Sequence, residues 1–152
     1  MVESVEQHYG NDGIVDRIVG ALTESGFDIG SLDPDVLAGA DEFHIGGREG
    51  TAHVASAIDL ADGDALLDVG CGIGGAARYL ARTTGASVTG VDLTPEFIEA
   101  AIKLSDLVGM GGQVDFKVGS ATDLPFMDNM FDAITMLHVG MNIEDKNQMM
   151  RE

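Results

Sequence analysis

A glycine-rich turn between a short apolar run and a helix-forming run constrains the fold of this chain most. Residues 65–69 read Ala-Leu-Leu-Asp-Val, which suits a buried parallel strand. Glycines follow at 70, 72, 74 and 75, and residues 76–81 favour a helix. A strand, a glycine turn and a helix in this order bring backbone N–H groups and a helix N-terminus up to a ligand. The stretch therefore predicts an α/β fold with a ligand site at this turn.

The rest of the chain divides into two parts around residue 60. Residues 1–60 predict an N-terminal helical extension that acts as a cap or lid, with helices at 4–9, 14–25 and 48–60 and a loop with a turn at 28–39. From residue 61 onwards, apolar strands alternate with helices, which indicates a parallel sheet. We expect strands at 65–69, 87–92, 114–118 and 131–137, helices at 76–84 and 95–108, and a helical segment from 142 onwards.

The charge at the glycine turn narrows the class of ligand. Gly70, Gly72 and Gly75 satisfy G-x-G-x-x-G, which by itself also fits a nicotinamide or flavin dinucleotide. Asp68 stands directly before the turn, where a carboxylate would repel a pyrophosphate and attract a positively charged group. Asp92 ends the second strand, where an acid can accept hydrogen bonds from both ribose hydroxyls. The alternative is that Asp92 caps a turn, a role that we expect Thr94 to fill for the next helix.

Two ordered motifs carry a resemblance to a known family. Asp-x-Gly-x-Gly-x-Gly at 68–74 resembles the first motif of the class I S-adenosylmethionine-dependent methyltransferases. The segment 119–137, with Gly-Ser-Ala, Leu-Pro-Phe and Phe-Asp in order, is most similar to the ubiquinone/menaquinone C-methyltransferases and the sarcosine/dimethylglycine-type N-methyltransferases. The resemblance covers about residues 43–150. It implies a Rossmann-like parallel sheet of strand order 3-2-1-4 with the later strands absent, and residues 61–152 as the N-terminal part of that domain.

The same resemblance implies S-adenosylmethionine as the cofactor and a small molecule as the acceptor in N- or C-methylation. By position, Asp68, Gly70, Gly72 and Gly74 would bind the methionine part, Asp92 and Leu93 the ribose and adenine, and Ser120 and Ala121 would line the adenine edge. Leu137 would complete the pocket, and Cys71 of the glycine turn is counted among the cofactor-binding residues. Cys71 is more consistent with a small filler of the turn than with a nucleophile. Ser120 stands where many relatives have Asp, so the adenine amino group would rely on a backbone carbonyl or a weaker hydroxyl.

Three residues are candidates for catalysis. His138 follows the fourth strand, at the end of the sheet where open α/β folds place their ligands. It could take a proton from the acceptor or position it, and the alternative is a loop histidine bonded to backbone. Tyr9 and His44 belong to the lid, and we expect both on the methyl side of the cofactor. The four histidines are scattered, so we expect no metal site.

The charge balance disfavours some partners. With 26 acidic and 8 basic residues the formal net charge is −18, which disfavours nucleic acid and anionic membranes and fits a cytoplasmic, salt-adapted protein. For the function, a nicotinamide-dependent oxidoreductase and a non-catalytic cofactor-binding fragment stay open beside the methyltransferase. The fourth strand, 131–137, is apolar on both faces, and no fifth strand follows it. We therefore expect its edge to be covered by a second copy or by a further C-terminal part.

Overall fold

The computed structural model describes residues 13–42 and 44–152, and the expected helix at 4–9 and Tyr9 lie outside the described residues. Its centre is a four-stranded parallel sheet of order β3-β2-β1-β4, which confirms the expected fold class and strand order. The strands are β1 (Ala65–Val69), β2 (Ser87–Asp92), β3 (Val114–Val118) and β4 (Ala133–Thr135). All four point the same way, so their carboxyl ends meet at one edge, where open sheets of this kind bind ligands.

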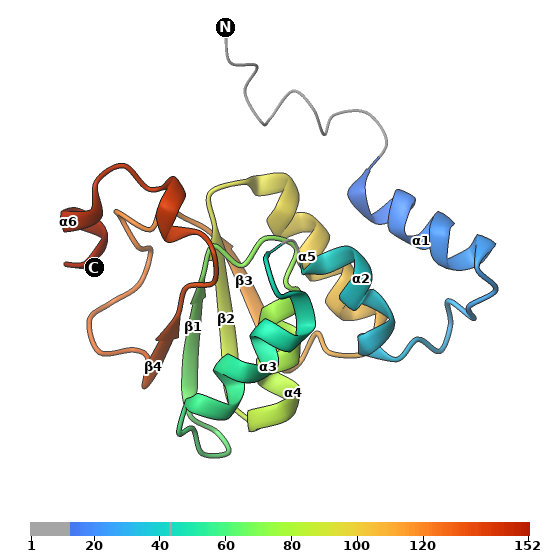
Figure 1. The fold of residues 1–152 in the computed structure, drawn as a ribbon, viewed down its shortest axis with the longest axis horizontal. Helices are drawn as coiled ribbons and strands as arrows, with labels where there is room; N and C mark the ends of the chain where they lie inside the picture. The colour runs from blue at the N-terminus through green and yellow to red at the C-terminus, as the bar shows by residue number, and fades with distance from the viewer. Residues whose placement is uncertain (1–12, 43) are drawn as a thin grey trace, which may run out of the picture.

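The longer helices gather on one side of this sheet (Figure 1). The crossovers are made by α4 (Gly75–Thr84), which packs on β2, and by α5 (Pro95–Leu107), which packs on β3. Two helices of the N-terminal part add a second layer. These are α1 (Ile14–Glu24), which contacts α5, and α3 (Gly47–Ala57), which contacts α4. The N-terminal part therefore covers the helices of the sheet domain and reaches its ligand-binding end.

The segment at 28–39, expected as loop and turn, does contain a turn, but its second half is more regular than expected. It forms a 3-10 turn, η2 (Pro34–Leu37), followed by the short helix α2 (Ala38–Asp41). The Asp33 side chain accepts the N–H of Asp35 at 2.8 Å and so begins the turn. Leu37 is fully buried in the core. Burial of this side chain and the Asp33 cap together order residues whose local sequence favours a turn.

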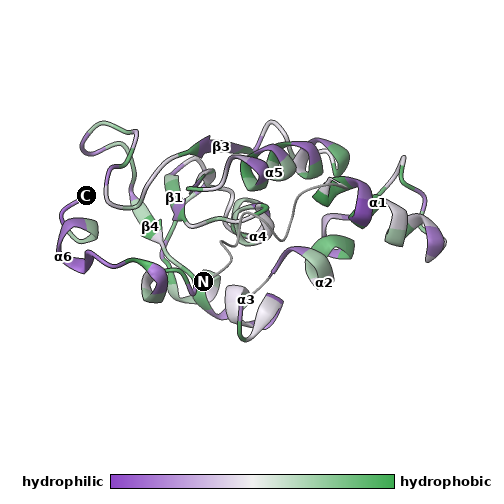
Figure 2. Ribbon diagram, turned by 90° about the horizontal axis from the view of Figure 1, so that it is seen from above, coloured by the Kyte–Doolittle hydropathy of each residue, from purple (hydrophilic) through white to green (hydrophobic). Residues whose placement is uncertain are grey.

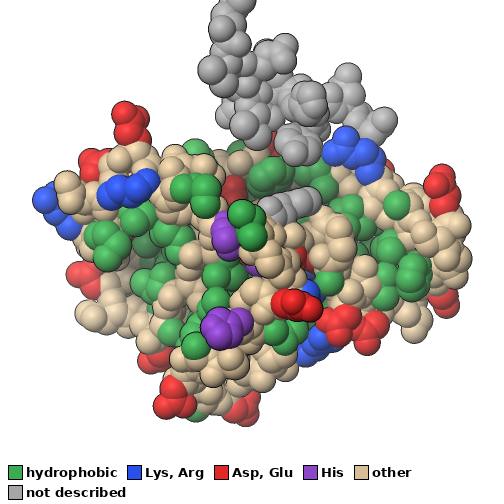
Figure 3. Space-filling model, in the orientation of Figure 1, with side chains coloured by type: hydrophobic (Ala, Val, Ile, Leu, Met, Phe, Trp, Pro, Cys, Tyr) green, Lys and Arg blue, Asp and Glu red, His purple; other side chains and the backbone are tan. Residues whose placement is uncertain are grey.

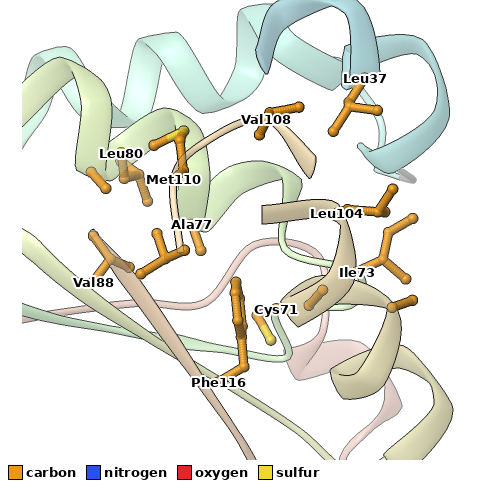
Figure 4. Close-up of a cluster of buried hydrophobic side chains, with 14 of the residues drawn as sticks. Leu37, Cys71, Ile73, Ala77, Leu80, Val88, Leu104, Val108, Met110 and Phe116 are labelled. Carbon is orange, nitrogen blue, oxygen red and sulfur yellow. The ribbon is translucent and has the colours of Figure 1, made fainter. Parts of the chain in front are cut away.

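Alternation along β1 builds two hydrophobic clusters, one on each face of the sheet. Leu66 belongs to the large cluster between the sheet and the helices, where Figure 4 shows Cys71 beside Phe116. Leu67 and Val69 point to the other face, whose cluster is covered by apolar residues between positions 121 and 136. Because both faces are covered, β1 can be apolar throughout except for Asp68.

The end of the chain departs from the expected pattern. The fourth strand has three residues instead of seven, and Ile134 is 57% exposed, so the expectation of a strand covered on both faces is wrong. β4 pairs only with β1, which makes it an edge strand among the described residues, and Figure 2 colours it as hydrophobic. The expected helical segment from 142 is confirmed in part, because residues Lys146–Met149 form the one-turn helix α6, while Gly140–Asn142 form the 3-10 turn η3.

Acidic side chains outnumber basic ones in this chain, 26 to 8. Figure 3 shows Asp and Glu spread around the rim of one face, as the 26 acidic residues lead one to expect. Large apolar side chains are also exposed towards the C-terminus, namely those of Met127, Met141 and Met150. Among the described helices, none combines the length and the apolar character needed to cross a membrane.

Candidate functional site

A cavity of about 880 Å³ opens at the carboxyl ends of the strands. It is lined by the glycine turn after β1, by the segments that follow β2, β3 and β4, and by two residues of the N-terminal part. Most residues singled out in the sequence line it: Asp68, Gly70, Cys71, Gly72, Asp92, Leu93, Ser120, Ala121, Leu137, His138 and His44. The topology thus brings together residues that are almost a hundred positions apart.

Asp68 lies at the floor of the cavity with one carboxylate oxygen unbonded. Its side chain is 2% exposed, and its Oδ1 accepts the hydroxyl of Thr135 at 2.8 Å. That bond follows from strand register, because Thr135 of β4 stands opposite Asp68 of β1. Oδ2 is buried and has no hydrogen-bond partner among the described residues. Burial raises the pKa of Asp68 to about 6, against the opposing effects of the Thr135 hydrogen bond and of His44.

Two glycines of the turn have different roles. Gly72 has a φ of +54°, and a Cβ added there would meet nothing within 4 Å, so the backbone at this position borders open space in the cavity. Gly74, at φ +86°, does not line the cavity. A Cβ on it would lie 2.7 Å from the ring of Phe116 and 2.8 Å from the guanidinium of Arg78. The structure therefore gives Gly74 a packing role at the start of α4, apart from the ligand contact that the sequence suggested.

Asp92 joins the ends of β1 and β2. Its Oδ2 accepts the N–H of Gly72 at 3.0 Å, and its Oδ1 accepts the N–H of Thr94 at 2.9 Å. Thr94 stands before α5, but its own side chain makes no capping hydrogen bond, so the expected capping by Thr94 is wrong and Asp92 orders this turn. Each carboxylate oxygen can accept a further bond. Asp92 thus holds the turn and still offers acceptor capacity to a ligand.

The far side of the cavity offers hydroxyl groups and an apolar surface. Ser120 and Thr122 lie after β3, with their hydroxyl oxygens 2.8 Å apart. Thr122 lines the cavity but was not expected from the sequence. Leu93 is 71% exposed beside Asp92 and contributes an apolar side chain to the lining of the cavity. Cys71 is buried, and burial raises the pKa of its thiol far above the ordinary range, which fits an inert filler.

The two candidate histidines meet in space. The rings of His44 and His138 stack with centroids 5.1 Å apart and planes 3° apart. His138 holds a φ of +57°, a left-handed conformation that is uncommon for a residue with a side chain. Because both line the cavity, a residue from the N-terminal part and one from the sheet domain share one wall. Nothing in the spacing of the sequence indicated this stack.

A buried carboxylate holds His44 in place. Glu42 accepts the hydroxyl of Thr51 at 2.7 Å, and the Nε2 of His44 lies 3.1 Å from that hydroxyl oxygen and 3.5 Å from the Glu42 carboxylate. Arg48 forms an ion pair with the other carboxylate oxygen of Glu42 at 2.7 Å. These positioning residues were not expected from the sequence, because a polar residue next to a loop carries no signal of burial.

Asp41, also missed, is the second N-terminal residue of the lining. Its Oδ2 accepts the Nη2 of Arg78 on α4 at 2.7 Å, in an ion pair that is almost completely buried. Arg78 also donates to the hydroxyl of Ser105 and to the carbonyls of Ile73 and Ala101. Burial raises the pKa of Asp41 and lowers that of Arg78. The N-terminal part is thus tied to the glycine-turn helix by a charged contact.

The cavity carries a negative electrostatic character. Its ionisable lining consists of five carboxylates and two histidines, and no Lys or Arg of residues 13–42 and 44–152 lines it: Asp41, Asp68, Asp92, Glu144, Asp145, His44 and His138. Such a site favours a cationic ligand and opposes a phosphate. The pyrophosphate of a dinucleotide is therefore a poor fit. A sulfonium with an attached ammonium is a good one, and the unpaired oxygen of Asp68 is the observation that supports it.

A parallel sheet of order 3-2-1-4, with the buried carboxylate of Asp68 before its glycine turn, is the arrangement expected for the cofactor-binding half of a class I methyltransferase. The sequence agrees, since the family model described as "Methyltransferase domain" matches residues 67–152, more than half of the chain. This chain belongs to that family of class I S-adenosylmethionine-dependent methyltransferases. The resemblance seen in its motifs is thereby confirmed, and the comparisons give the oxidoreductase alternative no support.

Its relatives are enzymes that act on small molecules. The chain is 35% identical over 125 residues to "Methyltransferase GfsG" of Streptomyces halstedii, covering 82% of this chain and 42% of that protein. It is 37% identical over 106 residues to phosphoethanolamine N-methyltransferase 3 of Arabidopsis thaliana, covering 70% and 21%. Among solved structures, phosphoethanolamine N-methyltransferase 2 of Haemonchus contortus, in complex with phosphomonomethylethanolamine and S-adenosylhomocysteine, matches with TM-score 0.64 and 28% identity, over 68% of this chain and 24% of that one. The chain thus spans between a fifth and about two fifths of the length of these curated relatives.

Proposed function

We propose that this chain binds S-adenosylmethionine and forms the cofactor-binding part of an enzyme that methylates a small molecule. The observation that carries the proposal is the buried Oδ2 of Asp68, which lacks a partner among the described residues in a cavity lined by acidic groups. A positively charged ligand would supply the missing partner. Family membership and the relatives' names support the same function.

The lining residues divide the work of binding. When bound, S-adenosylmethionine supplies an electrophilic methyl group on its sulfonium. Asp68 and the open backbone at Gly72 would receive the methionine part, and Asp92 would accept the ribose hydroxyls. Leu93 and the residues after β3 would enclose the adenine, with Ala121 and Leu137 as apolar neighbours. Ser120 and Thr122 would offer hydroxyls to its edge.

Three residues are proposed to act on the acceptor. His138 would take the proton that an amine or an activated carbon releases, since it lies on the wall of the cavity after β4. His44 stacks on it and would hold its ring in place. Tyr9, from the part outside the described residues, remains a proposed contact on the methyl side. In the complete protein, His138→Gln should lower the kcat of methyl transfer, and the exposed His53→Gln is the control.

The proposed acceptor is a neutral or cationic small molecule. Support comes from the lining, which offers carboxylates and histidines but no Lys or Arg among the described residues. The relatives' printed names include N-methyltransferases of phosphoethanolamine, so amine methylation is the chemistry that we favour over carbon methylation. Such a protein would work in the cytoplasm, and it would have no nucleic acid or membrane as partner.

Two further proposals concern the surface. The edge of β4 is unpaired among the described residues, and Ile134 is exposed on it, so we propose that a second copy or a further part of the protein covers it. Light scattering on the complete protein would show a dimer or a monomer. The net charge of −18 supports adaptation to salt. The melting temperature should then rise from millimolar to molar KCl, and a flat profile would contradict the adaptation.

Calorimetric titration tests the function directly. S-adenosylmethionine and S-adenosylhomocysteine should bind and raise the melting temperature, whereas NAD should do neither. Binding of NAD alone would overturn the proposal and restore the oxidoreductase. A complete protein that binds both methionine ligands but transfers no methyl group to any amine or carbon acceptor would instead favour the non-catalytic alternative.

A further inference from the structure

Val139, the residue after His138, packs directly on the glycine turn. A Cβ added to Gly70 would lie 2.2 Å from Cγ2, 2.6 Å from Cγ1 and 2.8 Å from Cβ of Val139. The valine side chain therefore occupies the space that any side chain at position 70 would need. Both residues line the cavity. The segment after β4 thus meets the turn after β1 at one tight contact.

The glycine turn is a firm support for this contact. The N–H groups of Gly70 and Cys71 both donate to the carbonyl of Val91, at 2.7 Å and 3.1 Å, and tie the turn to the end of β2. The carbonyl of Val139 accepts the N–H of Asn142 at 2.8 Å, at the start of η3. Val139 is thus held by its side chain against the turn and by its backbone in the segment that follows.

His138 depends on its neighbours for its place. Its φ of +57° lies in the left-handed region, and such a conformation persists in a residue with a side chain only when the surroundings hold it. Its ring makes no hydrogen bond to residues 13–42 and 44–152, and the contact that it does make is the stack on His44. The ring is therefore placed by that stack and by the backbone next to Val139.

The two stacked rings are held from opposite parts of the chain. His44 is held in the cover, where its Nε2 lies 3.1 Å from the hydroxyl oxygen of Thr51. His138 is held in the sheet domain, through the packing of Val139 on Gly70. The centroids of the two parallel rings are 5.1 Å apart, so a shift of either backbone would separate them.

We propose that Val139 is a positioning residue for methyl transfer: packed against Gly70, it holds the backbone of His138 in the left-handed conformation and its ring against His44. The inference rests on the proposed function, since it takes His138 as the group that accepts the proton of the acceptor. Val139 carries no group that can take or give a proton, so its effect on the chemistry passes through His138. Gly70 is then required as glycine by the acceptor side of the site as well as by the turn.

Two substitutions of one residue test this role. Val139→Ala removes both γ-methyl groups and opens a gap over Gly70, whereas Val139→Thr keeps the branch at Cβ. The matched control is Val36→Ala, which removes the same two methyl groups at a partly buried position that packs on the core and does not line the cavity.

Two measurements are made on each variant. The first is the nuclear Overhauser effect between the ring protons of His44 and His138 in the ligand-free protein, which needs no activity. The second is the steady-state kinetics of methyl transfer to ethanolamine, N-methylethanolamine and N,N-dimethylethanolamine, with calorimetric titration of S-adenosylhomocysteine. A change confined to packing would lower the melting temperature and leave the ring contact and kcat as they are.

In Val139→Ala the Overhauser effect between the two rings should be lost, and kcat should fall about tenfold or more. The KM for the amine and the affinity for S-adenosylhomocysteine should each change by less than about twofold. Val139→Thr should restore the ring contact and kcat. Val36→Ala should lower the melting temperature and change neither.

Four results would overturn the inference. An unchanged ring contact in Val139→Ala would show that His138 keeps its place without Val139. Loss of the contact with unchanged kcat would show that the stack does not serve the transfer, and equal losses of kcat and of S-adenosylhomocysteine affinity would make Val139 a support of the cofactor site. Failure of Val139→Thr to restore the contact would show that the branched shape does not hold His138.

A further variant covers the case in which Val139→Ala does not fold. Val139→Leu keeps an apolar side chain but loses the branch at Cβ that packs on Gly70, so the ring contact should again be lost; an unchanged contact contradicts the role of Val139. A wild type that transfers no methyl group to any of the three amines would overturn the proposed amine methylation instead. The Overhauser effects would then still decide whether Val139 places His138.

Discussion

The floor of the cavity and its cover hold their polar groups in different ways. The floor consists of the glycine turn and the ends of β1 and β2, and the cover consists of residues 41–42 and 44–51. In the floor, backbone N–H groups bond to Asp92 and a hydroxyl bonds to Asp68, and acceptor capacity is left over. In the cover, one oxygen of Glu42 accepts the hydroxyl of Thr51, and the other forms an ion pair with Arg48 that is not a hydrogen bond.

This difference suggests that the floor binds the ligand and that the cover positions side chains around it. Hydrogen-bond acceptors without a partner in the floor can bind a ligand. In the ligand-free protein they lower the free energy of unfolding, because they are buried without a hydrogen bond. Closed contacts in the cover stabilise the protein by themselves and orient His44 against His138. Asp41 is the exception in the cover, with one oxygen closed and one open. Substitutions of the floor residues that line the cavity should therefore affect affinity, and substitutions of the bonded residues in the cover should affect stability.

The largest effect is expected for Gly74→Ala in the turn. The left-handed φ of +86° costs a side chain about 1–2 kcal/mol, and the contacts with Phe116 and Arg78 add about 1–3 kcal/mol. The free energy of unfolding in urea should fall by about 2–5 kcal/mol. The matched change Gly72→Ala places its methyl group in open space, so the free energy of unfolding should fall only by the backbone strain. The affinity for the ligand should also fall. Similar losses of stability in both variants would contradict the separate roles of the two glycines.

Asp68 should make the ligand-free protein less stable as the pH rises. Its pKa is 3.8 ordinarily and about 6 in the folded state, so the folded state holds this proton more tightly than the unfolded state. Stability should be highest below pH 4, should fall by about 3 kcal/mol as the pH rises through 6, and should then level off. Other groups also titrate, so the difference between wild type and Asp68→Asn isolates this contribution. A difference that does not vary between pH 4 and 7 would show that burial does not raise this pKa.

Asp92→Ala should lower the affinity for S-adenosylmethionine about 10- to 100-fold, which corresponds to about 1.5–3 kcal/mol of binding free energy. The variant loses the acceptor for the ribose and also releases the N–H groups of Gly72 and Thr94. Calorimetric titration measures the loss. Asp115→Ala, at an exposed position of β3 outside the cavity, is the control and should bind as the wild type does. Normal binding by the Asp92 variant would remove this residue from the site.

The smallest effect is expected in the cover, for Thr51→Val. The change keeps the shape of a fully buried side chain but removes the hydroxyl that bonds to Glu42 and lies next to His44. The free energy of unfolding should fall by about 1–2 kcal/mol, while the affinity for S-adenosylmethionine should change less than threefold. An exposed counterpart, Thr83→Val, should change stability by less. A large loss of affinity with unchanged stability would reverse the division between floor and cover.

The sequence by itself determined the sheet and the position of the site. Apolar runs and glycine turns are local signals, so the strands at 65–69, 87–92 and 114–118 and the helix starting at Pro95 were predicted correctly. Asp68 and Asp92 could be identified because both lie in or end such runs. The class of ligand was also predicted from the residues of one short motif, which begins at Asp68.

Only the tertiary structure decided which polar groups are bonded and which are left open. The stack of His44 on His138, the pair of Asp41 with Arg78 and the closure of Glu42 join residues whose local sequence looks like solvated surface. The same holds for the turn at Pro34–Leu37, which forms because Leu37 is buried in a core made by distant strands and helices. A hydrogen bond depends on distance and burial, and neither is encoded by spacing along the chain when the partners come from different elements.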